Sequence, residues 1–295
     1  MEKLADQLRM LVSKHESEME EKVLLVFNKY RIFNKGSDGG TGISVYSKNL
    51  KKENIIELGR DVDGAFFYNN NLYDYTNSAF WLNPRDYNLH NTLKNELVSV
   101  PEFEKANIKE THIYNNKIYA RLNCDDCTGR VIDLFSGMII NGDTGSKETL
   151  FVLDDRLCSS THHKVYDVFT NDSILLLEDI LTDSIRLFSQ KKKKYMLIEH
   201  SICDYTLYSL PDDIQYPYDF PTDERMIKKN KIGDYEHING LCLYDEILYY
   251  YDNGCEIYDL FNKKNSVNFN YPKDKSGGIT ALVVVPKRII VDKLE

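Results

Sequence analysis

Residues 255–261 have the sequence CEIYDLF and follow a predicted hairpin over residues 240–253. The same unit, a hairpin and a third strand that ends on Asp, an aliphatic residue and Phe, recurs over residues 111–137 and 149–169. Its third strand has the sequence VIDLF in one copy and VYDVF in the other. A unit that recurs along a chain indicates a repeat architecture, in which neighbouring copies bury one another's apolar faces.

Fainter copies of this unit extend from residue 22 to the end of the chain. Short strands of alternating polarity, rich in Tyr, Phe, Ile and Val, are separated there by Asn, Asp, Gly and Lys, which is typical of β-strands and turns. The two longest segments between predicted strands, residues 85–109 and 211–237, are predicted to be insertions into the repeat. The aligned third strands carry large residues roughly 35 to 50 positions apart, at Tyr46, Trp81, Ile132, Tyr166, Tyr208 and Tyr258.

With this spacing, and with Asp133, Asp167 and Asp259 at aligned strand ends, the sequence resembles a degenerate WD-repeat β-propeller, whose blades have about 40–45 residues and four strands each. The Trp-Asp dipeptide itself is replaced at nearly every blade. The resemblance covers about residues 22–295 and implies an all-β propeller of about seven blades, with six as the alternative. A C-terminal hairpin over residues 278–292, turning at Pro286-Lys287, is expected to close the ring and remove its free sheet edges.

The first 21 residues have a different pattern. Leu4, Leu8, Leu11, His15 and Met19 are three or four positions apart, which predicts one apolar stripe of an α-helix over residues 1–21. The helix has two interpretations. It packs on its own propeller, or it presents Leu4, Leu8 and Leu11 to a groove on a partner protein.

Net charge, apolar runs and cysteine content indicate the cellular compartment and the classes of partner to expect. The formal net charge is −9, which argues against uniform, non-specific binding to nucleic acid. No apolar run approaches the roughly 20 residues of a membrane span, and the first residues have no apolar signal-peptide core. Six cysteines without such a signal indicate free thiols in a reducing compartment. We therefore expect a cytoplasmic protein without a membrane contact.

The charges are predicted to segregate between the two faces of the ring. In a four-stranded blade, the turns between strands 1 and 2 and between strands 3 and 4 lie on one face, here called the first face. Acidic residues fall mainly on the other, second face. The alternative is that lysines occupy turns only because turns are exposed. The predicted first-face cations are Lys51, Lys52, Lys191, Lys192, Lys193, Lys194, Lys263, Lys264, Lys287 and Arg288, and the insertion adds Arg225, Lys228, Lys229 and Lys231.

Four residues in neighbouring loops form a candidate zinc site. Cys124 and Cys127 have the Cys-x₂-Cys spacing of a zinc half-site, and Cys158 and His162 follow at the equivalent loop of the next blade. With His163, which follows His162, two thiolates and two imidazoles from neighbouring loops suit tetrahedral zinc. The alternative is that Cys158 lies within a strand and packs in the core.

No catalytic motif is present. The glycine-rich residues 36–42 lack the Gly-Lys-Ser/Thr of a phosphate-binding loop, and neither a Gly-x-Ser-x-Gly elbow nor a His-Glu-x-x-His motif occurs. We expect no enzyme and no small-molecule substrate. The predicted function is a non-catalytic propeller that docks within a protein complex through its basic face and its N-terminal helix. The alternative is a ribosome- or RNA-associated factor that occupies an rRNA surface and regulates or blocks translation.

Overall fold

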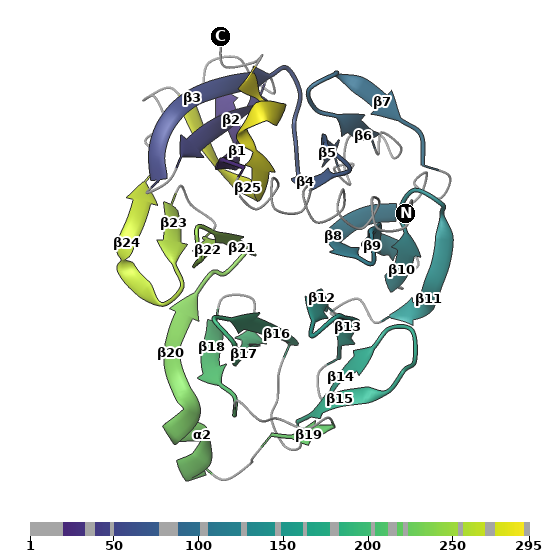
Figure 1. Cartoon of the computed structure of the whole chain (residues 1–295), viewed down its shortest axis with the longest axis vertical. Helices are drawn as coiled ribbons and strands as arrows, with labels where there is room; N and C mark the ends of the chain where they lie inside the picture. The colour runs from purple at the N-terminus through teal and green to yellow at the C-terminus, as the bar shows by residue number, and fades with distance from the viewer. Residues whose placement is uncertain are drawn as a thin grey trace, which may run out of the picture.

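Six sheets, antiparallel except for one short parallel edge strand, stand around a central axis, so the protein is an all-β, six-bladed propeller (Figure 1). A computed structural model describes residues 20–32, 39–47, 50–76, 88–100, 106–124, 129–144, 149–161, 164–177, 183–201, 204–211, 217–220, 224–252, 256–268 and 275–291. The predicted N-terminal helix, with Leu4, Leu8 and Leu11, lies outside these residues. Only its last two positions, Glu20 and Glu21, are described, and they form an irregular lead into the first strand.

The first three blades run from the innermost to the outermost strand as follows. Blade 1 contains β25 (Lys275–Pro286), β1 (Lys22–Ile32), β2 (Gly39–Ser47) and β3 (Lys51–Leu58). Blade 2 contains β4 (Gly64–Tyr68), β5 (Asn71–Thr76), β6 (Asn88–Asn91) and β7 (Glu96–Val98). Blade 3 contains β8 (Ala106–Tyr114), β9 (Lys117–Cys124), β10 (Gly129–Asp133) and β11 (Met138–Thr144).

The other three blades follow in the same order. Blade 4 contains β12 (Thr149–Leu153), β13 (Arg156–Ser160), β14 (Lys164–Asp167) and β15 (Ser173–Leu176), with β19 (Tyr218–Asp219) parallel at its edge. Blade 5 contains β16 (Ser184–Gln190), β17 (Lys193–Ser201), β18 (Asp204–Ser209) and β20 (Lys231–Glu236), with helix α2 (Glu224–Asn230) before β20. Blade 6 contains β21 (Gly240–Tyr244), β22 (Ile247–Tyr251), β23 (Glu256–Asp259) and β24 (Asn262–Asn268).

The ring closes through a single strand, which corrects the prediction of seven blades and of a C-terminal hairpin. β25 pairs with β1 from Lys22 opposite Pro286 to Ile32 opposite Lys275. The residues after Pro286 form a short 3₁₀ turn, Lys287–Ile289, and no return strand. Asn28, which in the sequence resembles the first residue of an Asn-Lys turn, lies inside β1 at a register shift of the β1–β25 ladder. In place of the expected C-terminal hairpin, β25 and β1 form one long strand pair that completes blade 1.

The two predicted insertions also contain blade strands. Residues 85–109 include β6, β7 and the start of β8, and residues 211–237 include β19, α2 and β20. The third strand of blade 2 is β6. His90 of β6 therefore occupies the large-residue position of the third strand, for which the internal alignment of the repeat units predicts Trp81. Trp81 itself lies outside the described residues. The short outer strands of blade 2 have no strong alternating pattern, which is why the sequence alignment missed them.

Five of the turns between strands 1 and 2 have the same backbone. Both central residues have positive φ in Asn69-Asn70, Asn115-Asn116, Asp154-Asp155, Lys191-Lys192 and Asp245-Glu246. This backbone is that of a two-residue type I′ hairpin, which matches the twist of the flanking strands and favours Asn and Asp. The turns between strands 1 and 2 of these five blades therefore share one backbone conformation.

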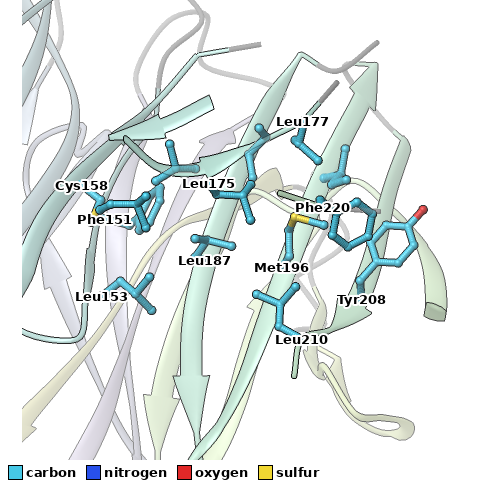
Figure 2. Packing of buried hydrophobic residues seen from close by; sticks show 14 residues of the cluster. Phe151, Leu153, Cys158, Leu175, Leu177, Leu187, Met196, Tyr208, Leu210 and Phe220 are labelled. Carbon is cyan, nitrogen blue, oxygen red and sulfur yellow. The ribbon is translucent and has the colours of Figure 1, made fainter. Parts of the chain in front are cut away.

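The core lies between blades. Figure 2 shows the cluster between blades 4 and 5, in which Phe151, Leu153 and Cys158 pack toward Leu187 and Met196. Two glycines allow tyrosines to pack over the innermost strands. A Cβ on Gly64 would approach the Tyr75 ring to 2.2 Å, and one on Gly240 would approach the Tyr251 ring to 2.6 Å.

Candidate interaction faces

The first face carries every described member of the predicted basic set. Lys51 and Lys52 begin β3, Lys193 and Lys194 begin β17, and Lys231 begins β20. The turn before β17 contains Lys191 and Lys192, α2 contains Lys228 and Lys229, and the 3₁₀ turn contains Lys287 and Arg288. Lys263, Lys264 and Arg225 lie in β24 and α2, but their side chains are outside the described part of the structure.

Four of these cations pair with acids of the same chain. The Lys194 ammonium lies 2.5 Å from an Asp154 carboxylate oxygen, and Lys231 lies 2.7 Å from Asp234. Lys287 lies 3.0 Å from Glu21 and 3.5 Å from Glu53, and Arg288 pairs with Glu20. The Lys194 pair joins blade 5 to blade 4, and the last two anchor the chain that leads into β1. Lys194, Lys287 and Arg288 therefore have a structural use, whereas the Lys231–Asp234 pair lies within one strand and is exposed.

The other described cations of the set are available to a partner. Lys191 lies 3.9 Å from Glu246, but both side chains are largely exposed, and such pairs contribute little free energy. Six more form no ion pair within the described ranges, and all six are exposed: Lys51, Lys52, Lys192, Lys193, Lys228 and Lys229.

Exposed apolar side chains gather on the same face. Among the described residues, large apolar side chains are exposed at Ile55, Leu97, Ile113, Met138, Ile139, Val152, Phe169, Ile232, Leu243, Phe261 and Val291. Ile55 lies within β3 and Leu97 in the middle of the three-residue β7. The others lie in first-face turns or within two residues of them. Exposed apolar side chains concentrated on one surface of a soluble protein mark an interaction site.

Sequence reasoning missed these apolar residues. Ile113, Val152 and Leu243 each lie one position before the end of an innermost strand, and their exposed fractions are 50%, 37% and 55%. A strand pattern predicts burial for aliphatic residues on an inner strand. Their exposure arises because the ends of the inner strands border the centre of the ring (Figure 1).

Polar side chains from several blades meet at the inner strands. The Arg186 guanidinium donates a hydrogen bond to Glu110 at 2.6 Å, and the second Glu110 oxygen accepts one from the Leu150 amide at 2.6 Å. On blade 6, the Tyr251 hydroxyl donates to the Thr280 carbonyl at 2.9 Å. The Glu110 carboxylate thus joins the innermost strands of blades 3, 4 and 5. This arrangement favours a role for Glu110 in holding the ring together.

The second face has an acidic groove between blades 5 and 6. Its volume is about 720 Å³, and it is lined by His200, Asp204, Tyr205, Thr206, Asp234, Tyr235, Glu236, His237, Tyr250, Asp252 and Tyr258. Asp204 lies directly opposite Glu236 across the β18–β20 ladder, and like charges in this position destabilise a sheet. Among the described residues that line the groove there is no lysine or arginine, so the charge of the groove is opposite to that of the exposed lysines on the first face.

The candidate zinc ligands are only partly described. Cys158 is fully buried in the cluster between blades 4 and 5, as the core-packing alternative proposed (Figure 2). Burial and the nearby Asp167 raise the pKa of the Cys158 thiol to about 12, whereas zinc binds the thiolate. Cys127, His162 and the side chain of Cys124 lie outside the described residues. Among the residues that are described, no three His, Cys, Asp or Glu side chains are grouped to hold a metal ion.

Comparison with known proteins identifies no relative by sequence: no family model matches the chain, and no curated protein matches it. Solved structures with a similar arrangement include the computationally designed Ika8 protein, at a TM-score of 0.41 and 12% identity over 82% of this chain and 86% of that one. They also include a chain of a mitotic checkpoint complex, at a TM-score of 0.43 and 10% identity over 81% and 72% of the two chains. No helix in the described ranges is long and apolar enough to span a membrane.

Proposed function

We propose that this protein is a non-catalytic, cytoplasmic interaction module that docks within a larger protein assembly through the first face of its propeller. The observation that carries the proposal is the concentration of exposed apolar side chains and unpaired lysines on that one face. An apolar centre with a charged surround is the usual anatomy of a protein–protein interface. The resemblance of the sequence to WD-repeat propellers points the same way, and the stripe at Leu4, Leu8 and Leu11 is a second proposed contact.

RNA binding is the second candidate function. The six unpaired lysines favour it, because phosphate contacts come mainly from Lys and Arg. Ile113, Val152 and Leu243 favour protein instead, since aliphatic side chains in the middle of a face gain nothing from a phosphate backbone. A ribosome-bound factor would combine both kinds of contact on this face.

Affinity capture of the full chain from its own cells tests the proposal. One variant removes the first-face features (Leu243→Ser, Lys52→Glu and Lys192→Glu), and a matched variant changes the second face (Asp204→Asn and Glu236→Gln). We expect defined proteins with the wild type and the second-face variant, retained at high salt, and their loss with the first-face variant. Ribosomal subunits or RNA that dissociate steeply with salt would support the second candidate. Equal capture by all three chains would refute a first-face site.

A further inference from the structure

The chain enters the ring at a fixed point on the first face, beside blade 2. Glu20 lies two residues before β1, and its carboxylate pairs with the Arg288 guanidinium. The same guanidinium donates a hydrogen bond to the side-chain oxygen of Asn70 at 2.9 Å. Asn70 belongs to the turn between strands 1 and 2 of blade 2. The segment that precedes Glu20, residues 1–19, is therefore joined to the ring on the first face, next to this turn.

An exposed apolar surface lies at the next two blades. The Tyr68 hydroxyl of blade 2 donates a hydrogen bond at 2.5 Å to the Asn116 carbonyl, in the equivalent turn of blade 3. Ile113 lies just before that turn and is 50% exposed. The next residue, Tyr114, stacks on Phe169 of blade 4, which is 47% exposed, with ring centroids 5.7 Å apart. Ile113, Tyr114 and Phe169 are here called the blade 3–4 surface.

The apolar stripe of residues 1–19 has a length that suits this surface. In a helix with a rise of about 1.5 Å per residue, Leu11 and Leu4 would lie about 14 and 24 Å from Glu20. Packed sheets are about 10 Å apart, so blades 3 and 4 follow blade 2 at about 10 and 20 Å around the ring (Figure 1). The leucines of the stripe therefore reach blades 3 and 4 from the point of entry.

Packing on its own ring is also favoured by the energetics of a short helix. An isolated helix of this length is marginal in water and gains most of its stability from burial of its apolar face. Burial of one leucine side chain contributes roughly 1.5–3 kcal/mol. The tether at Glu20 keeps the stripe at a local concentration on the order of millimolar near the first face, without the translational cost that a separate partner has.

From these observations we infer that residues 1–19 dock on the first face of their own ring, with Leu4, Leu8 and Leu11 on the blade 3–4 surface. The inference goes beyond the proposed function, because it makes part of the docking face self-covered in the free protein. The stripe then contacts a partner only after it leaves this surface. The two interpretations of the stripe, packing on the propeller and docking on a partner, are successive states of one segment.

Photo-crosslinking of the purified full chain tests the inference. A photoreactive phenylalanine analogue replaces Phe169, and the crosslinked peptides of the monomer fraction are identified by mass spectrometry. We expect crosslinks within one chain to residues 1–19. In a chain that also has Leu4→Glu, Leu8→Glu and Leu11→Glu, we expect their yield to be about tenfold lower, because a carboxylate is unfavourable in an apolar contact.

The matched control places the same analogue at Phe261, the equivalent position of blade 6, on the other side of blade 1. Phe261 is 39% exposed and packs on Tyr195 of blade 5 with ring centroids 4.8 Å apart. We expect no crosslink from Phe261 to residues 1–19. A segment that samples the whole face without docking would crosslink equally from both positions, and this result would overturn the inference.

Three other results would also overturn it: no crosslink from Phe169 to residues 1–19, an unchanged yield with the three glutamates, or crosslinks that join two chains, which would assign the surface to a second copy. The purified chain contains no partner, so these outcomes do not depend on the proposed function. Affinity capture with the first-face variant tests that function separately, and either can fail alone.

Discussion

At the scale of single residues, two aspartates at equivalent positions explain why one short pattern recurs along the chain. Asp167 accepts hydrogen bonds from the amides of Phe169 at 2.8 Å and Thr170 at 3.2 Å. Asp259 accepts equivalent bonds from Phe261 and Asn262 at 2.9 and 3.1 Å. The Phe that follows packs on a tyrosine of the preceding blade, as Phe169 does on Tyr114 with ring centroids 5.7 Å apart. The pattern therefore caps a turn and joins two blades.

Replacing Asp167 by Ala removes the carboxylate oxygen that accepts both hydrogen bonds and leaves two turn amides to water. We expect a loss of about 1–2 kcal/mol in the free energy of unfolding, comparable to the loss of a helix N-cap. Chemical denaturation of the two chains measures it. Asp172→Ala is the control, because Asp172 is an exposed residue of the same turn. An equal effect of the two substitutions would contradict the capping role.

Two histidines predict how stability depends on pH. Burial and the nearby Arg60 lower the pKa of His90, and burial and Arg186 lower that of His112, each partly offset by an acid. The unfolded chain then binds protons more readily than the folded one just below pH 6.5. The contribution of the two neutral histidines to the free energy of unfolding is therefore complete above about pH 7. It is lost as the pH falls through the pKa values that they have in the folded chain.

Thermal melting at pH 7.5 and pH 5.5 tests this expectation. We predict that the melting temperature of the wild type falls more between these two values than that of a chain with His90→Gln and His112→Gln. The acidic groups of the two chains are the same, so they cancel in the comparison. An identical fall in both chains would show that neither histidine titrates with a lowered pKa.

At the scale of elements, the turns decide stability as well as binding. Changing Lys191-Lys192 to Asn-Asn puts better left-handed residues into an unchanged turn. The lost Lys191–Glu246 contact is exposed and contributes little. We expect the variant to be roughly 1 kcal/mol more stable, which raises the melting temperature by about 2–4 °C. A less stable variant would mean that the lysines stabilise the ring and are not retained for a partner.

The strand pattern was a reliable guide to most hairpins. In the copies of the unit over residues 111–137, 149–169 and 240–261, the first three strands lie close to where alternation and turn residues predict them, as in β21, β22 and β23. It failed where chain ends meet: a bulge at Asn28 resembles a turn, and the β1–β25 pairing has no local signal. The exposure of Val152 and Leu243 could not be predicted, because it depends on how the inner strands end around the centre of the ring.

At the scale of the whole molecule, ring closure depends on β25. Removing residues 275–291 would expose the edge of β1, whose residues Val23–Phe27 are fully buried. We expect the shortened chain to aggregate, because a long apolar edge strand pairs with other chains. Size-exclusion chromatography measures this, and removal of residues 292–295 alone serves as the control. A soluble, monomeric product with an unchanged melting temperature would contradict closure through this strand.

We propose that one face of this propeller, the one with exposed apolar side chains and with lysines that form no ion pair among the described residues, docks on a protein. Site-specific photo-crosslinking in the protein's own cells tests it most directly, with the photoreactive residue placed at Leu243 or, on the outer strand of blade 1, at Ile55. We predict crosslinks to a defined protein from Leu243 and none from Ile55. Crosslinks to RNA, or to the same protein from both positions, would contradict the claim.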